Sequence, residues 1–166
     1  MIKKYIIIFL ISMIPLIELR GAIPIGLSRA FGDPIPVIPL YIICILANMI
    51  PVPFIYLFAR KVLIWGSNKK FIGKFFKWCL EKGEKGGKEL TEKAGKTGLF
   101  LALLLFVGIP LPGTGAWTGT LAASILDMDF KKSSIAIILG VILAGIIMGL
   151  AYAGVFGAVG TIFGVK

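Results

Sequence analysis

The chain has 166 residues, of which 58% are hydrophobic and 16% charged; its mean hydropathy is +0.97 and its formal net charge is +10. Soluble domains carry about 25% charged residues, so this composition excludes an ordinary soluble protein and predicts one all-α membrane domain over residues 1–166. The chain has no histidine, and its two cysteines form no CxxC motif. We therefore expect no metal and no cofactor, and the lack of a Walker sequence argues against ATP-driven activity.

The first repeat-like unit covers residues 1–59. Its start, "MIKKYIIIFLISMIPL", resembles a signal peptide but lacks a small-x-small cleavage site, so we expect it to be retained. Apolar runs at 5–17 and 22–31 flank the stretch "ELRG", and "GDPIP" then leads into a longer run at 37–59. Only the last run is long enough to be an unambiguous span, and the two shorter ones suit the half-helices of a re-entrant hairpin.

A strongly basic linker follows at residues 60–98. It holds eleven Lys or Arg against four Glu, a net +7, and basic loops resist translocation, so we expect it on the cytoplasmic side. Aromatic side chains interleave with the lysines at near-helical spacing, which predicts an amphipathic helix on the inner leaflet; a solvated basic loop is the alternative. Nucleic-acid binding is not expected, because anionic lipid explains the charge. The aromatic residues are Trp65, Phe71, Phe75, Phe76 and Trp78.

The second unit, residues 99–166, repeats the plan of the first. An apolar run at 99–107 precedes the break "GIPLPGTG", and runs at 116–126 and 133–165 follow, the last forming one long helix or two shorter ones. A shift of 94 residues pairs Gly21 with Gly115 and Asp33 with Asp127, although the identities are few. Each unit would contain a re-entrant hairpin, which does not cross the membrane, and one helix that does. Because the number of crossings is odd, the second unit starts on the opposite side, so we expect two inverted-topology repeats. This arrangement places Lys3 and Lys4 outside, against the usual charge bias.

Both breaks contain residues that interrupt helices. Such backbone is tolerated at membrane depth only where protein or a water-filled cavity satisfies its polar groups. We therefore expect the two breaks to face each other, with half-helix N-termini directed at an anion. The interrupting residues are Pro15, Gly21, Pro24, Gly108, Pro110, Pro112, Gly113 and Gly115.

Glu18 and Arg20 place two charges in this apolar region, where each costs roughly 2.5 to 3.5 kcal/mol on insertion scales. In the functional interpretation, Arg20 binds a phosphate or carboxylate, while Glu18 holds Arg20 or carries a coupling proton. The structural alternative is a buried ion pair that fixes the hairpin, or snorkelling of both side chains to the interface.

The second hairpin offers hydroxyl groups and an amphipathic ring, from Thr114, Trp117, Thr118 and Thr120. Packing by small residues is the alternative role for these positions. Secondary candidates are Arg29, Asp33, Asn48 and Asp127. Asn48 lies in a span and needs a partner, as glue between helices or as part of a site, and the two aspartates fit turns and caps.

The motifs "PLIELRGAIPIG" and "GIPLPGTGAWTG" resemble the small multi-drug export protein family and, more distantly, the DedA superfamily. The first motif matches at Glu18, Arg20, Gly21 and Pro24, and the second is a less specific glycine-proline pattern. DedA-like proteins are implicated in moving polyprenyl-phosphate lipid across the bacterial inner membrane. By that resemblance Arg20 would meet the lipid phosphate and Glu18 would take part in proton coupling. Thr114 stands where the half-to-half comparison would want a second arginine, which argues against a symmetric two-arginine site.

These observations together predict a multi-pass transporter or translocase of the inner membrane, with an anionic lipid phosphate as the leading substrate and H⁺ as a candidate coupling ion. The first alternative is a proton-coupled exporter of small cationic drugs, in which Glu18 would bind the substrate. The second is a non-transporting scaffold, homo-oligomeric through the glycine-rich C-terminal span. An enzyme is not expected, because the sequence shows no nucleophile-base pair and no catalytic residue.

Overall fold

The computed structural model describes residues 2–30, 32–69 and 73–163, and this part of the chain is built from helices and the turns between them. The side chains of residues 79, 83, 84, 90, 91 and 155–163 are outside the description. The helices are α1 (Ile2–Met13), α2 (Glu18–Leu27), α3 (Val37–Met49), α4 (Pro51–Ser67), α5 (Gly73–Gly108), α6 (Ala116–Ile125) and α7 (Phe130–Phe163).

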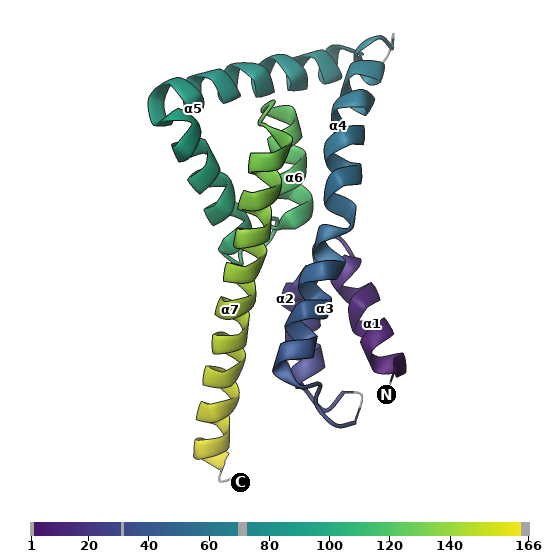
Figure 1. Ribbon diagram of the computed structural model, residues 1–166, viewed down its shortest axis with the longest axis vertical. Coiled ribbons are helices and arrows are strands. Elements are labelled where there is room, and N and C mark those ends of the chain that lie inside the picture. The colour runs from purple at the N-terminus through teal and green to yellow at the C-terminus, as the bar shows by residue number, and fades with distance from the viewer. Residues whose placement is uncertain (1, 31, 70–72, 164–166) are drawn as a thin grey trace.

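The helices form two short hairpins beside two long columns (Figure 1). Helices α1 and α2 form the first hairpin in the lower half of the molecule, and α3 and α4 then run upward as one column. Helix α5 crosses the top, bends downward and pairs with α6 as the second hairpin, and α7 runs down the whole length. The prediction of an all-helical chain is therefore confirmed for the described residues.

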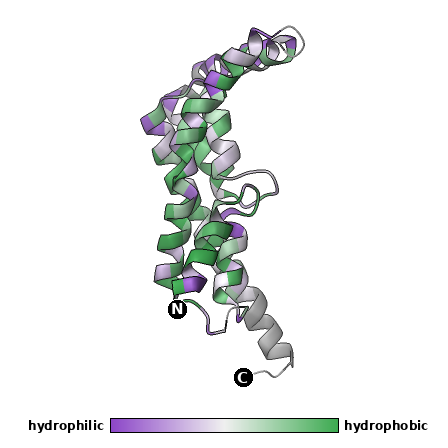
Figure 2. Cartoon of the chain, turned by 90° about the vertical axis from the view of Figure 1, so that its right-hand side faces the viewer, coloured by the Kyte–Doolittle hydropathy of each residue, from purple (hydrophilic) through white to green (hydrophobic). Residues whose placement is uncertain are grey.

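Two segments are long and apolar enough to cross a membrane, namely Val37–Ser67 with 31 residues and Phe130–Gly154 with 25 residues. Figure 2 shows hydrophobic residues along the middle of the helices and hydrophilic ones gathered toward the end occupied by the first part of α5. This distribution is the one a bilayer requires, because charged groups are costly in hydrocarbon.

The column of α3 and α4 is longer than the run predicted at 37–59, since it continues to Ser67. It is interrupted at Ile50 because Pro51 and Pro53 lack the N–H groups that would continue the α3 hydrogen bonds. Trp65 therefore lies in α4, and the prediction that it belongs to the amphipathic helix of the linker was wrong. Phe71 lies outside the described residues, whereas Phe75, Phe76 and Trp78 do lie on α5.

Helix α5 bends at Gly95, whose φ of 68° is a left-handed value that glycine adopts without a steric penalty. The bend separates a lysine-rich part before Gly95 from an apolar part that ends at Gly108. Phe75 and Trp78 are exposed on the first part, in agreement with an amphipathic helix at a membrane surface. The final apolar run forms the single helix α7, so of the two alternatives the one-helix interpretation holds within the described residues.

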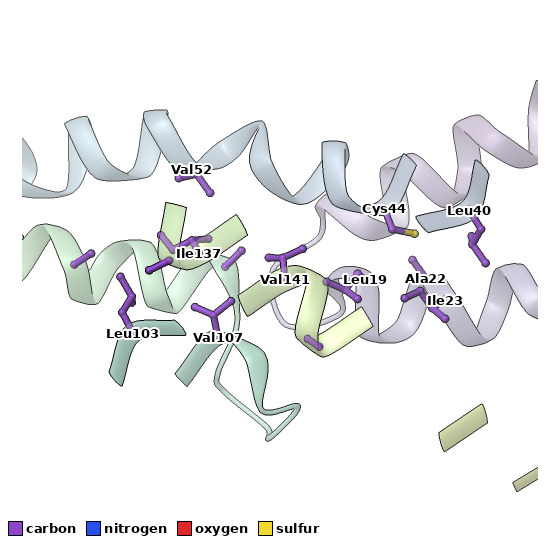
Figure 3. Close-up of a cluster of buried hydrophobic side chains, with 14 of the residues drawn as sticks. Leu19, Ala22, Ile23, Leu40, Cys44, Val52, Leu103, Val107, Ile137 and Val141 are labelled. Carbon is purple, nitrogen blue, oxygen red and sulfur yellow. The ribbon is translucent and has the colours of Figure 1, made fainter. Parts of the chain in front are cut away.

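The core lies between the hairpins and the columns (Figure 3). Leu19, Ala22 and Ile23 of α2 pack together with Leu40 and Cys44 of α3, and Leu103 and Val107 of α5 pack near Ile137 and Val141 of α7. Close approach of α3 and α7 depends on glycine, because a Cβ at Gly149 would overlap the Tyr41 hydroxyl. Tyr41 also donates a hydrogen bond to the Gly145 carbonyl at 2.8 Å. The core thus holds both hairpins against the long helices.

Candidate functional site

The tip of the first hairpin contacts the tip of the second, and both tips lie near the middle of the molecule (Figure 1). Glu18, the first residue of α2, is only 3% exposed. Its carboxylate accepts hydrogen bonds from the backbone N–H of Ala116 at 3.2 Å and of Trp117 at 3.1 Å. These are the first two residues of α6. Glu18 therefore occupies a helix N-terminus, where the exposed N–H groups and the helix dipole favour an anion.

Arg20 contacts the C-terminal end of α5 and the loop that follows it in the second hairpin. Its guanidinium donates to the Leu111 carbonyl at 2.5 Å, to the Thr114 hydroxyl at 2.8 Å and to the Val107 carbonyl at 3.3 Å. Val107 belongs to the last turn of α5, where unpaired carbonyls favour a cation. The acid and the base of α2 thus complement the opposite dipole ends of α5 and α6.

These hydrogen bonds confirm the expectation that the two breaks face each other. We call the set of Glu18, Arg20 and the segment 107–117 the hairpin junction. The first hairpin supplies the charged side chains to the junction, while the second supplies mainly backbone groups. A symmetric pair of arginines is absent from it, as the Thr114 position already indicated.

Thr114 organises the loop of the second hairpin. Its hydroxyl accepts from Arg20 and from the Leu111 N–H at 3.3 Å, and it lies 2.9 Å from the carbonyls of both Ile109 and Leu111. A hydroxyl has one proton to donate, so it serves one of these carbonyls at a time. Thr114 therefore links Arg20 to the loop backbone.

Backbone geometry at both tips is unusual. In the first hairpin Leu16 and Glu18 have φ values of 74° and 50°, which are left-handed conformations that side chains other than glycine seldom adopt. In the second, Gly115 has φ 140° and ψ −172°, a region essentially restricted to glycine. A Cβ at Gly115 would lie 2.3 Å from a Glu18 carboxylate oxygen. Glycine at this position therefore allows Glu18 to reach the α6 N-terminus.

The first break lies earlier than predicted. Residues 14–17 form the turn, and "ELRG" begins α2, so Gly21 and Pro24 lie inside a helix and do not interrupt it. The left-handed residues at the tip let the helix start at Glu18, and Pro24 is accommodated in its later turns. In the second hairpin the turn at 109–115 contains Pro110, Pro112 and Gly113 as predicted, while Gly108 ends α5 and packs on Leu143.

The remaining polar candidates of α6 mostly bind their own helix. The Thr118 hydroxyl donates to the Gly115 carbonyl at 3.5 Å, and the Thr120 hydroxyl donates to the Ala116 carbonyl at 2.5 Å. Trp117 joins the junction through its backbone N–H, while its indole Nε1 is buried without a protein hydrogen-bond partner. Arg20 Nε is buried in the same way. Arg20 Nε and Trp117 Nε1 are therefore two buried N–H donors without a protein acceptor in the described part of the chain.

Three secondary candidates lie away from the junction. Arg29 and Asp33 are exposed in the turn between α2 and α3, where the Asp33 carbonyl accepts a hydrogen bond from Lys4 at 2.9 Å. Asp127, with φ 55° in the turn between α6 and α7, pairs with Arg60 of α4. Their places agree with turn residues rather than with a shared binding site.

Asn48 is fully buried and joins α3 to α1. Its amide donates to the Ser12 hydroxyl at 2.6 Å and to the Cys44 carbonyl at 2.8 Å, and Ser12 itself donates to the same carbonyl at 3.2 Å. The sequence had indicated that Asn48 needs a partner but not that Ser12 provides it. This cluster serves as the glue between helices that was one of the two expected roles.

We expect Ser12→Ala to lower the thermal stability of the protein in detergent, because it removes one of the two acceptors of the Asn48 amide. Loss of a buried hydrogen bond of this kind costs about 1 kcal/mol, which corresponds to a few degrees in Tm. Ser67→Ala is the matched control, since among the described residues the Ser67 hydroxyl donates to the Ile64 carbonyl of its own helix and joins no second helix. Equal Tm values for the two variants would contradict a role for Ser12 in joining the helices.

Sequence reasoning missed the backbone partners of the charged pair, namely the carbonyls of Val107 and Leu111 and the N–H groups of Ala116 and Trp117. The only signal for them was the break itself, because a helix end exposes unpaired N–H and C=O groups. Asp129 was missed as well. Its carboxylate accepts from the Lys132 N–H at 2.9 Å and caps α7.

Comparison with protein families assigns the sequence to a known group. The family model described as "Putative small multi-drug export protein" matches residues 18–147. The matched region begins at Glu18, so it contains every residue of the hairpin junction. Comparisons with curated proteins and with solved structures gave no match. Since the family model covers more than half of the chain, the protein belongs to the small multi-drug export protein family.

Proposed function

We propose that this membrane protein is a transporter that moves anionic amphiphiles, with a lipid phosphate as the leading substrate, through the hairpin junction. The observation that carries the proposal is that the junction holds oxygen acceptors at the Arg20 guanidinium and a carboxylate at a helix N-terminus. Three oxygen acceptors surround the Arg20 guanidinium, and a carboxylate lies on the α6 N-terminus. The unpaired buried donors, Arg20 Nε and Trp117 Nε1, point to the same chemistry.

The substrate would replace internal groups one for one. Phosphate oxygens can take the places of the Leu111 and Val107 carbonyls at the Arg20 fork, which suits bidentate recognition of phosphate. Protonation of Glu18 would remove the internal anion from the α6 N-terminus and free the N–H groups of Ala116 and Trp117. Proton uptake and anion binding would in this way be linked at one place.

Backbone strain supports a junction that opens. Leu16 and Glu18 are held in left-handed conformations, each of which costs roughly 1 to 3 kcal/mol and persists only where surrounding contacts impose it. Separation of the hairpins would remove the contacts of Glu18 and Arg20 and release this strain. The energy difference between closed and open junctions would then be small enough for a proton or a substrate to shift.

For the membrane topology we propose two inverted repeats. The hairpins of α1 with α2 and of α5 with α6 point toward each other from opposite ends of the molecule (Figure 1). If each hairpin re-enters from its own side, the basic part of α5 lies in the cytoplasm of a bacterial inner membrane, as its charge favours. Both chain ends would then lie outside, with Arg29 and Asp33.

An exporter of small cationic drugs is the second candidate, because the family name refers to multi-drug export and Glu18 is a buried carboxylate. In that mechanism Glu18 would leave the α6 N-terminus and bind the cation directly. Arg20 would then disfavour the substrate through charge repulsion, which is why we place this function second.

The two functions are separated by transport in reconstituted vesicles with a pH gradient. We expect the protein to translocate a fluorescent lipid phosphate and not ethidium, and we expect Glu18→Gln to abolish the response to the gradient. Glu81→Gln, the same change on the exposed face of α5, should leave it intact. Movement of ethidium without lipid would replace the proposal by cation export, and movement of neither would favour the scaffold.

A further inference from the structure

Two adjoining cavities lie above the second hairpin, where α5 bends over the turn between α6 and α7. The larger has a volume of about 780 Å³ and a mixed polar and charged lining. Its charged lining residues are Lys88, Glu92, Lys96, Asp127, Asp129 and Lys132. We call it the charged chamber. Gly87 lets α5 lie close to the end of α6, because a Cβ at position 87 would lie 2.4 Å from the Leu126 carbonyl oxygen.

The charges of the chamber favour an anion once their internal pairing is considered. Asp127 is paired with Arg60, and the Asp129 carboxylate accepts the Lys132 N–H as the cap of α7. Three lysines, Lys88, Lys96 and Lys132, line the same space. The Asp129 carboxylate already occupies the N-terminus of α7, so this helix end adds no further positive charge to the chamber. Counted with Arg60, the chamber has four cations, which are Arg60 and the three lysines, against the three acids Glu92, Asp127 and Asp129, so its net charge is +1.

The smaller cavity has a volume of about 190 Å³, and its lining is entirely apolar. It shares Leu99, Leu126 and Met128 with the charged chamber and continues between α5 and α6 along Leu103, Phe106 and Ala122. We call it the apolar groove. A charged space beside an apolar one, with shared lining residues, matches a ligand with a polar head and a hydrocarbon chain, because each part then meets its own kind of surface.

We infer that the charged chamber and the apolar groove together bind a phosphate-bearing amphiphile, with the phosphate among the three lysines and the alkyl chain in the groove. This site shares no residue with the hydrogen bonds of Glu18 and Arg20 and does not depend on the function proposed for the hairpin junction. Lysine binds phosphate as a point charge through its ammonium donors. Burial of the chain adds affinity in proportion to the apolar area removed from water.

The test measures binding of three small probes to the full chain in maltoside micelles by calorimetry. Octyl phosphate carries both features, octyltrimethylammonium carries the chain with a cation, and inorganic phosphate carries the head alone. We expect octyl phosphate to bind at least tenfold more tightly than either of the others. Equal binding of the cationic probe, or of inorganic phosphate, would overturn an amphiphile site of this charge.

Two pairs of variants locate the site. Lys96→Gln with Lys132→Gln should weaken octyl phosphate binding about 100-fold, at roughly tenfold for each charged hydrogen bond lost. Lys82→Gln with Lys93→Gln removes the same charge from exposed positions outside the cavities and should change binding less than threefold. Ala122→Phe should fill the groove and weaken octyl phosphate about tenfold without affecting inorganic phosphate.

Leu121→Phe is the control for the groove, because Leu121 is exposed beside it and does not line it. Thermal unfolding identifies variants that fail to fold. If a double lysine variant fails to fold, its two single variants are measured in the binding experiment instead. If the two lysine pairs weaken binding equally, the attraction is a property of the whole basic surface and the inference is wrong. It is also wrong if Ala122→Phe and Leu121→Phe behave alike.

Discussion

Arg20→Ala is expected to reduce translocation of a lipid phosphate by about 100-fold or more in reconstituted vesicles. The guanidinium is the group that would hold the phosphate, and charged hydrogen bonds worth roughly 3 kcal/mol in total correspond to about this factor. In the closed junction the same change removes the guanidinium donor from the Leu111 and Val107 carbonyls and from the Thr114 hydroxyl. The Tm in detergent should therefore fall as well.

Two further variants separate the loss of transport from the loss of stability. Arg20→Lys keeps the charge but not the planar fork, so it should recover part of the Tm and little of the transport. Arg29→Ala removes an arginine that is exposed in the turn between α2 and α3, and both quantities should stay at the wild-type level. Full transport by a folded Arg20→Ala protein would show that Arg20 only joins the hairpins.

The contact between the two breaks could be predicted from the sequence because few groups can satisfy a charge at membrane depth. Glu18 and Arg20 stand among apolar residues, and the second break is another place in an apolar stretch where prolines and glycines interrupt regular helix. Unpaired backbone groups and unpaired charges then have each other as the available partners. The same reasoning predicted the turn at 109–115, where prolines and glycines are dense.

The individual partners could not be predicted, because they are backbone atoms whose position depends on where each helix ends. Glu18 and Arg20 were considered as partners of each other, whereas the structure gives Glu18 the start of α6 and Arg20 the end of α5. That division requires α2 to begin at Glu18, which depends on left-handed conformations at Leu16 and Glu18. Such conformations in residues other than glycine leave no sequence signal.

The end of the first column was missed for a related reason. Basic residues such as Arg60 and Lys61 suggested that the span stops near residue 59, but helix propensity does not change there. Arg60 instead pairs with Asp127 in the turn before α7, and Tyr56 donates to the Met128 carbonyl in the same turn. Tertiary partners of this kind let α4 continue to Ser67 and place the charged chamber beside it.

Gly115→Ala is expected to cause the largest loss of stability of any single methyl addition in the hairpin junction, about 2 to 4 kcal/mol. One part is backbone strain, because φ 140° with ψ −172° lies in a region essentially restricted to glycine. The other part is overlap, since the added Cβ would lie 2.3 Å from a Glu18 carboxylate oxygen. Relief of the overlap would require Glu18 to leave the N–H groups of Ala116 and Trp117.

Gly113→Ala is the matched control, because Gly113 has φ 83° in the same turn but no neighbour within 4 Å of an added Cβ. It should cost only the strain, about 1 kcal/mol, and the difference between the two Tm values then reports the contact with Glu18. Combining Glu18→Ala with Gly115→Ala should cost less than the sum of the two changes, because the overlap is already gone. If the two losses of stability were strictly additive, Gly115 and Glu18 would not be in contact. The position given above for the Glu18 carboxylate at the N-terminus of α6 would then be wrong.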